Sequence, residues 1–203
     1  SLKTPEDAAK ALESPNLATR YLAWEKLHNW GNEAVPALEE MYKSDNPRFQ
    51  ARALWLLSKL PGKGTHYIGE ALQDKNEDIR ITAIRAATEL PADIIPIRKQ
   101  VVKDPSPQVR REAILALHHN HSAEAPALWA QLAQQYDGKD RWYLEALGIG
   151  ADQQWDSFFA AWRQQAGDGW NTPAGRDIVW RSRSGAARPM LAQIIEDPAI
   201  DPE

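Results

Sequence analysis

His118, His119 and His121 are the first residues to test for chemistry, because clustered histidines are common metal ligands. On a helix, His118 and His119 point about 100° apart. No Asp or Glu follows His118 at the third or fourth position, where a helical metal site would take its next ligand. We favour a solvated helix end, at which histidine charge suits the helix dipole. A metal site is the alternative, and we expect no metal.

A basic and aromatic cluster lies near the C-terminus and is the second candidate. Its members are Arg176, Trp180, Arg181, Arg183 and Arg188. Such side chains could bind an anionic ligand or an acidic patch of another domain. The alternative is intramolecular pairing, with cation–π packing of arginine on tryptophan.

The segment DRWYLEALGIGA, residues 140–151, combines two adjacent aromatic side chains with two glycines. On a helix, Trp142 and Tyr143 lie on adjoining faces. Gly148 and Gly150 either end this helix or let a neighbouring helix approach closely. We favour core packing between repeats, and a docking or ligand surface is the alternative.

Several classes of enzyme lack their motifs in this chain. There is no cysteine, which excludes disulfides, thiolate metal sites, cysteine nucleophiles and the Cys-x-x-Cys-His attachment of c-type haem. There is also no Gly-x-Ser-x-Gly and no phosphate-binding Walker loop. We therefore expect no catalytic residues and no cofactor in these 203 residues.

Composition limits the partners. The net charge is −4, whereas a nucleic-acid surface normally needs a basic patch. No apolar run approaches the 18 residues of a membrane span. We expect neither nucleic-acid binding nor membrane insertion by this segment.

A 30-residue repeat organises the elements that must position these side chains. Small residues recur at that interval in Ala23, Ala53, Ala83 and Ala113, each followed by a large apolar residue. Four residues after each alanine come Leu27, Leu57, Ala87 and Leu117, which is helical spacing. The small residue should lie where two helices approach closely. Each unit also contains a second helix, opened by Pro36, Pro96 and Pro126, with His66 in the remaining unit.

One such pair of helices cannot bury its own apolar face, but stacked pairs can. The repeat predicts an all-α fold, an α-α superhelix in the form of a right-handed solenoid of about five to six helix pairs. We expect one domain over residues 1–203, with regular repeats over 14–133 and degenerate repeats over 134–197. The later helices should cover 155–163, 176–183 and 189–196. The loop-like ends suggest a piece of a longer protein.

A polar position also recurs, three residues before the small one, in Arg20, Gln50, Arg80 and Arg110. We interpret the arginines as a ladder that pairs with loop aspartates of the same or the next unit. An anion-binding stripe is the alternative.

This pattern resembles the HEAT repeat family. Residues 104–117 and 74–83 carry the resemblance, since each has an Asp, then Val or Ile with Arg, then Ala. Some HEAT proteins are di-iron hydroxylases built on His-Glu dipeptides, and this chain has no such dipeptide.

The phrases at residues 16–24, 46–57, 140–151 and 175–181 look like the HEAT-like middle region of large exported bacterial proteins. These are membrane-bound dehydrogenase or haem-binding proteins, in which a sugar-dehydrogenase-like propeller precedes the helices and a c-type cytochrome domain follows. The resemblance implies an exported or periplasmic location. It also implies protein domains of the same parent chain as partners.

We therefore expect a non-catalytic scaffold and protein-interaction module. The alternative is a stand-alone HEAT-type enzyme or nucleic-acid-binding module. The expected docking surface lies where the repeat decays and consists of Trp142, Tyr143, Trp180, Arg176, Arg181, Arg183 and Arg188.

Overall fold

The computed structural model describes residues 2–90 and 95–200. These residues form the helices α1 to α13 with three short 3-10 helices, and they contain no strand. The all-α prediction is confirmed. The chain divides into two compact units, residues 1–97 and 98–203, and each is described by itself.

In the first unit the helices are α1 (Pro5–Leu12), α2 (Leu17–Trp30), α3 (Val35–Tyr42), α4 (Pro47–Leu57), α5 (Gly64–Ala71) and α6 (Glu77–Thr88). Helix α7 (Ile95–Val101) spans the division. In the second unit they are α8 (Pro107–Leu115), α9 (Ala125–Ala133), α10 (Arg141–Gly150), α11 (Trp155–Ala166), α12 (Pro173–Arg181) and α13 (Arg188–Glu196). The 3-10 helices cover Gly31–Ala34, Gly167–Trp170 and Gly185–Ala187.

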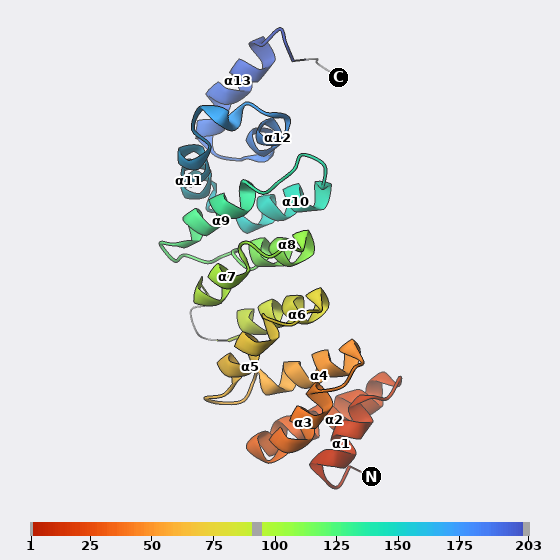
Figure 1. Ribbon diagram of the computed structural model, residues 1–203. Helices are drawn as coiled ribbons and strands as arrows, with labels where there is room; N and C mark the ends of the chain where they lie inside the picture. Colours follow the sequence, from red (N-terminus) through yellow and green to blue (C-terminus); the bar gives the residue numbers. More distant parts are fainter. Residues whose placement is uncertain (1, 91–94, 201–203) are drawn as a thin grey trace. The chain divides into compact units, whose positions relative to one another are not determined.

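The helices pack as the repeat predicts (Figure 1). In the first unit, α3 packs on α4 and α5 packs on α6, while α4 lies between α2 and α6. In the second unit, α10 lies between α8 and α12, α9 packs on α11, and α12 packs on α13. The first helices of successive repeats therefore form one layer of each unit, and the second helices form the other.

Helix α1 lies before residue 14, where we expected the repeats to begin. Its local signals are clear, because the Thr4 side chain accepts a hydrogen bond from the backbone N–H of Asp7, and Pro5 occupies the first turn. The helix buries Ala8 and Leu12 and packs against α2 and α3. It takes the place of a second helix at the N-terminal end of the layer.

A polar residue caps each regular first helix, and these caps also recur every 30 residues. The side chains of Asn16, Asn46, Asn76 and Ser106 accept hydrogen bonds from backbone N–H groups of the first turn. Each such cap stabilises its helix by about 1 kcal/mol. In α10 the cap is Asp140, four residues beyond the expected position, and this shift is where the repeat loses its register.

Ala23, Ala53, Ala83 and Ala113 are fully buried, each with 0% of its surface exposed. The predicted burial of these four residues is therefore confirmed. The large neighbours Leu54, Ile84 and Ile114 are buried too, whereas Trp24 is only half-buried. Trp24 thus belongs partly to the core and partly to the surface of the first unit.

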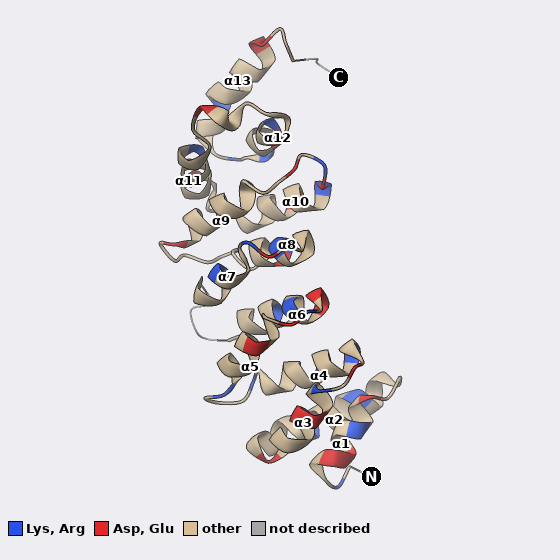
Figure 2. Cartoon of the chain, viewed as in Figure 1, with Lys and Arg blue, Asp and Glu red and all other residues tan. Residues whose placement is uncertain are grey.

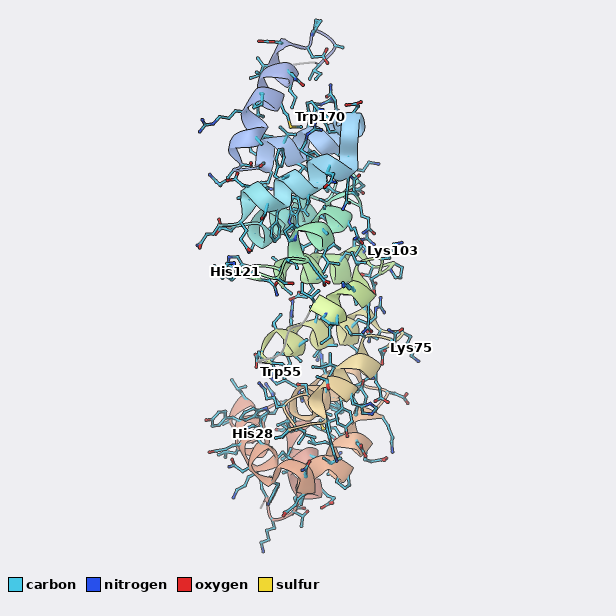
Figure 3. The ribbon with its side chains drawn as sticks, turned by 90° about the vertical axis from the view of Figure 1, so that its left-hand side faces the viewer. His28, Trp55, Lys75, Lys103, His121 and Trp170 are labelled. Atoms are coloured by element: carbon cyan, nitrogen blue, oxygen red, sulfur yellow. The ribbon has the colours of Figure 1, made fainter. Side chains whose placement is uncertain are left out.

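Figure 3 shows that, within the first unit, His28 and Trp55 lie at one edge and Lys75 lies at the opposite edge. Lys75 is in the loop that leads into α6, and Trp55 is near the C-terminal end of α4. The capping loops and the C-terminal ends of the first helices therefore line opposite edges of this unit.

Candidate interaction surfaces

Two tryptophans stand out on the surface of the second unit. Trp142 on α10 is 71% exposed and Trp180 on α12 is 74% exposed. The two helices pack against each other, so both side chains belong to one layer of this unit. Side chains of this size are normally buried, and their exposure marks a candidate surface for another molecule.

Arg181, which follows Trp180, reaches across to α10. Its Nη2 atom is 3.3 Å from Oε2 of Glu145, and its guanidinium covers Gly148. A Cβ atom at Gly148 would lie 2.1 Å from Cζ of Arg181. The lack of a side chain at Gly148 therefore lets the Arg181 side chain lie against the helix, which agrees with the close approach expected at this glycine.

Gly150 lies at the contact between α10 and α8. A Cβ atom there would lie 2.5 Å from the backbone carbonyl oxygen of Ile114 on α8. The helix continues to Gly150. The sequence suggested that Gly148 and Gly150 either end the helix or let a neighbour approach closely. The structure shows close approach at both glycines.

Tyr143 is 2% exposed and does not belong to an exposed surface, which corrects its place in the expected docking set. Its hydroxyl group donates a hydrogen bond to the carbonyl of Leu132 at 2.9 Å. The guanidinium of Arg110 lies over its ring, and the ring stacks with that of Tyr136. Burial raises the pKa of the Tyr143 phenol above its usual value. Counted from the helix cap, Tyr143 takes the position of Ile79 and Val109, which are also buried, so it is a packing residue.

The arginines of the C-terminal cluster have separate surroundings. A hollow of about 380 Å³ brings together Trp180, Arg181 and Arg183, with Glu145 as their acidic neighbour. Arg176 donates a hydrogen bond to Oδ1 of Asn171 at 3.2 Å. Arg188 is exposed at the start of α13. The carboxylate of Glu145 offsets the charge of Arg181, so this hollow is a mixed surface and not a purely cationic one.

The three histidines lie beyond the end of α8. Nε2 of His118 is 3.9 Å from Oδ2 of Asp152, and His119 has a φ of 57°. His121 lines a separate hollow of about 660 Å³ with Asp152 and Asp156. Among the residues that the structure describes, no group of three or more His, Asp or Glu side chains is placed to hold a metal ion.

The recurring arginines bind backbone carbonyl groups of their own loops. Nη1 of Arg20 donates to the carbonyls of Ser14 and Pro15, and Nη1 of Arg110 donates to those of Asp104 and Pro105. Arg80 makes the same pair of bonds to its loop. The contact of each arginine with its own loop is as we expected, and the acceptors described here are backbone carbonyls. Pairing with loop aspartates stays a prediction for these arginines.

Gln50 takes the arginine position in the second repeat and behaves differently. Its Nε2 atom donates to Oδ2 of Asp74 at 2.8 Å, which lies in the loop of the following repeat. A hydrogen bond to the loop aspartate of the following repeat, as predicted for the arginines, is therefore made here by the side-chain amide of Gln50.

A groove of about 480 Å³ in the first unit was not predicted from the sequence. It is lined by the aromatic rings of Tyr21, Trp24 and Trp55 and by the side chains of Arg20, Arg52 and Arg85. A signal was present, because Leu17, Tyr21 and Trp24 follow one another at helical spacing on a face next to that of Ala23. The repeat indicates Trp24 only as the large apolar residue that follows Ala23.

Lys and Arg residues are interspersed with Asp and Glu residues along the helices of each unit (Figure 2). Among the described residues, no helix is both long and apolar enough to cross a membrane.

Residues 65–148 match the family model described as HEAT repeats. No curated protein and no solved structure matches the chain. The matched range includes both segments, 74–83 and 104–117, on which we based the resemblance to this family. Together with the paired helices, the match supports a HEAT-repeat domain with an all-α fold.

Proposed function

We propose that this chain is a non-catalytic scaffold and protein-interaction module. The exposure of Trp142 and Trp180 on adjacent helices carries the proposal. Tryptophan and arginine are enriched at protein interfaces and supply much of the binding energy there. Arg181, Arg183 and Arg188 accompany the two tryptophans in the same unit. No cofactor takes part in this role.

The mechanism is geometric. HEAT repeats suit scaffolds, since each stacked helix pair contacts mainly its neighbours and leaves an extended face for other proteins. In the second unit, α10 is held against α8 through Gly150 and against α12 through Arg181. The exposed tryptophans therefore stand on helices whose positions are fixed by close contacts.

The finer proposal concerns the parent protein. We propose that the module lies between a sugar-dehydrogenase-like propeller and a c-type cytochrome domain of an exported bacterial protein. Its partners would then be domains of the same parent chain. The phrases at residues 16–24, 46–57, 140–151 and 175–181 support this proposal, which rests on the resemblance alone.

The repeated arginines do not favour the nucleic-acid alternative. A module that grips DNA would present its repeated cations to the phosphates. Arg20, Arg80 and Arg110 instead bind loop carbonyls of the same chain.

Hydrogen exchange in this chain alone and in the intact parent protein tests the proposal. We expect residues 140–195 to exchange more slowly in the parent, because docking of a neighbouring domain would cover α10 and α12. Residues 125–133 in the buried helix α9 serve as the internal reference. Equal protection of residues 140–195 in both samples would show that no domain docks there.

A further inference from the structure

The groove of the first unit crosses the layer of first helices α2, α4 and α6. Tyr21 is 63% exposed, and Leu17, at the start of α2, is 72% exposed. Trp24 and Trp55 are half-buried, so their rings form the floor of an open groove. Its volume of about 480 Å³ lies in the range of sites that bind small ligands or a few side chains.

The charges along this groove have one sign. Arg20, Arg52 and Arg85 line it, and none of the described residues that line it is an Asp or a Glu. Burial, and then the neighbouring charges of Arg20 and Arg48, lower the pKa of the Arg52 guanidinium. An anion placed in the groove would offset this concentration of positive charge.

Two of these guanidinium groups are held in position by backbone carbonyls. Nη1 of Arg52 donates to the carbonyl of Leu12 at 2.5 Å, and Nη1 of Arg20 donates to the carbonyls of Ser14 and Pro15. A guanidinium has five N–H donors, so each keeps further donors for a carboxylate. The groove therefore offers preoriented donors and loses little side-chain entropy on binding.

The rings are supported as well. Trp24 stacks on His28, with centroids 4.9 Å apart and planes 9° from parallel. Nζ of Lys59 lies 5.6 Å from the centroid of Trp55, and this lysine pairs with Glu89. Fixed aromatic surfaces of this kind make effective contacts for an apolar side chain.

We propose that this groove binds an acidic peptide segment of a partner protein, with a large apolar side chain on Trp24 and Trp55 and flanking carboxylates on Arg20 and Arg52. The proposal deepens the interaction role and rests on it, but it uses a face of the first unit and not the tryptophans of α10 and α12. A single-stranded nucleic acid is the main competitor, because bases stack on aromatic rings beside arginines. The aliphatic lining by Leu12, Leu17 and Ala51 favours a peptide side chain.

Selection from a displayed random peptide library, with this chain immobilised, tests the chemistry of the partner. We expect the enriched peptides to carry a large apolar residue beside Asp or Glu. Enrichment without an acidic bias, or no enrichment, would overturn the proposal. Tighter binding of oligodeoxythymidine than of the best peptide would overturn it in favour of nucleic acid.

Titration calorimetry with the best acidic peptide then locates the site. Tyr21→Ser and Arg52→Gln should each weaken binding about tenfold, which corresponds to about 1.4 kcal/mol. Arg20→Gln, which removes the other proposed carboxylate contact, replaces Arg52→Gln if that variant does not fold. Unchanged affinity in both a Tyr21 and an arginine variant would place the peptide elsewhere.

The matched control is Trp180→Ala, which changes an exposed aromatic residue of the second unit. It should bind the peptide as the wild type does. Peptide binding lost in Trp180→Ala but retained in the groove variants would contradict the groove while supporting the face on α12. The groove and the interaction role can therefore fail independently.

Discussion

Single side chains hold neighbouring helices together at defined points. The hydroxyl of Tyr67 on α5 donates to Oε1 of Glu39 on α3 at 2.7 Å, and that of Tyr136 donates to Oδ2 of Asp177 on α12 at 3.0 Å. Burial, followed by the carboxylate neighbour, raises the pKa of Tyr67 to about 12 and also raises that of Tyr136. These phenols stabilise the fold as neutral donors.

Tyr67→Phe should therefore lower the free energy of unfolding by an amount that depends on pH. A raised pKa in the folded state gives stability that is complete below the unfolded value of about 10 and is lost as the pH rises to about 12. We expect the variant to be less stable at pH 7 by about 1 kcal/mol. The difference should shrink between pH 10 and pH 12 in urea unfolding. Tyr21→Phe, at an exposed position, controls for loss of a hydroxyl as such, and a Tyr67→Phe difference that is flat with pH would contradict the account.

Ala83 tests the contact that defines the repeat. It is fully buried in α6, so Ala83→Leu should overpack the helix contact and lower the free energy of unfolding by about 1–3 kcal/mol. Chemical unfolding measures the loss. Ala18→Leu, at an exposed position of α2, should change stability little. Equal stability of the two variants would mean that the small residue has no packing role.

Neighbouring residues approach α10 closely at Gly148 and Gly150, and the two glycines meet different atoms. Gly150 meets a backbone carbonyl of α8, which cannot move aside. Gly148 meets the end of the Arg181 side chain, which can swing away and give up its pair with Glu145. The same substitution should therefore have unequal effects two residues apart.

Gly150→Ala should destabilise the protein by about 1–3 kcal/mol, since α8 and α10 must separate. Gly148→Ala should stay within about 1 kcal/mol of the wild type, because the gain in helix propensity offsets a partly exposed ion pair. Thermal unfolding of both variants measures this. A larger loss for Gly148→Ala than for Gly150→Ala would show that the packing of α10 is different.

The elements that could be predicted from sequence are those with a period. The helices of residues 14–133 follow from the interval between Ala23 and Ala53, and the helices near 155–163 and 176–183 follow from local apolar spacing. Helix α1 was missed because it precedes the first full period, although Thr4 and Pro5 are good starting signals. The packing of α1 on α2 and α3 shows that it belongs to the helical stack, which the repeat in the sequence did not indicate.

Exposed surfaces were harder to predict, since the exposure of a side chain depends on which neighbouring helix covers it. Trp142 and Trp180 proved exposed and Tyr143 proved buried, although Trp142 and Tyr143 are adjacent. The groove was missed for the same reason. From the sequence, Tyr21 and Trp24 are only apolar residues at helical spacing. In the structure, nothing among the described residues of the layer α2, α4 and α6 covers their side chains fully.

At the scale of the whole molecule, the structure presents aromatic side chains on the first-helix layers of both units. One set lies in the groove across α2, α4 and α6, and the other lies on α10 and α12. Packed neighbouring helices keep each set in place within its own unit. Such contact faces on stacked helices suit the proposed scaffold. The right-handed superhelical sense stays a prediction.

The most direct measurement of the central claim is the affinity of this chain for the propeller and cytochrome domains of the proposed parent protein, supplied as separate polypeptides, by titration calorimetry. We predict saturable binding that weakens about tenfold or more in Trp142→Ala/Trp180→Ala. It should be unchanged in the control Leu22→Ala, at a 54% exposed position of α2. Binding that is absent, or that is equal in the wild type and the double variant, would contradict the account.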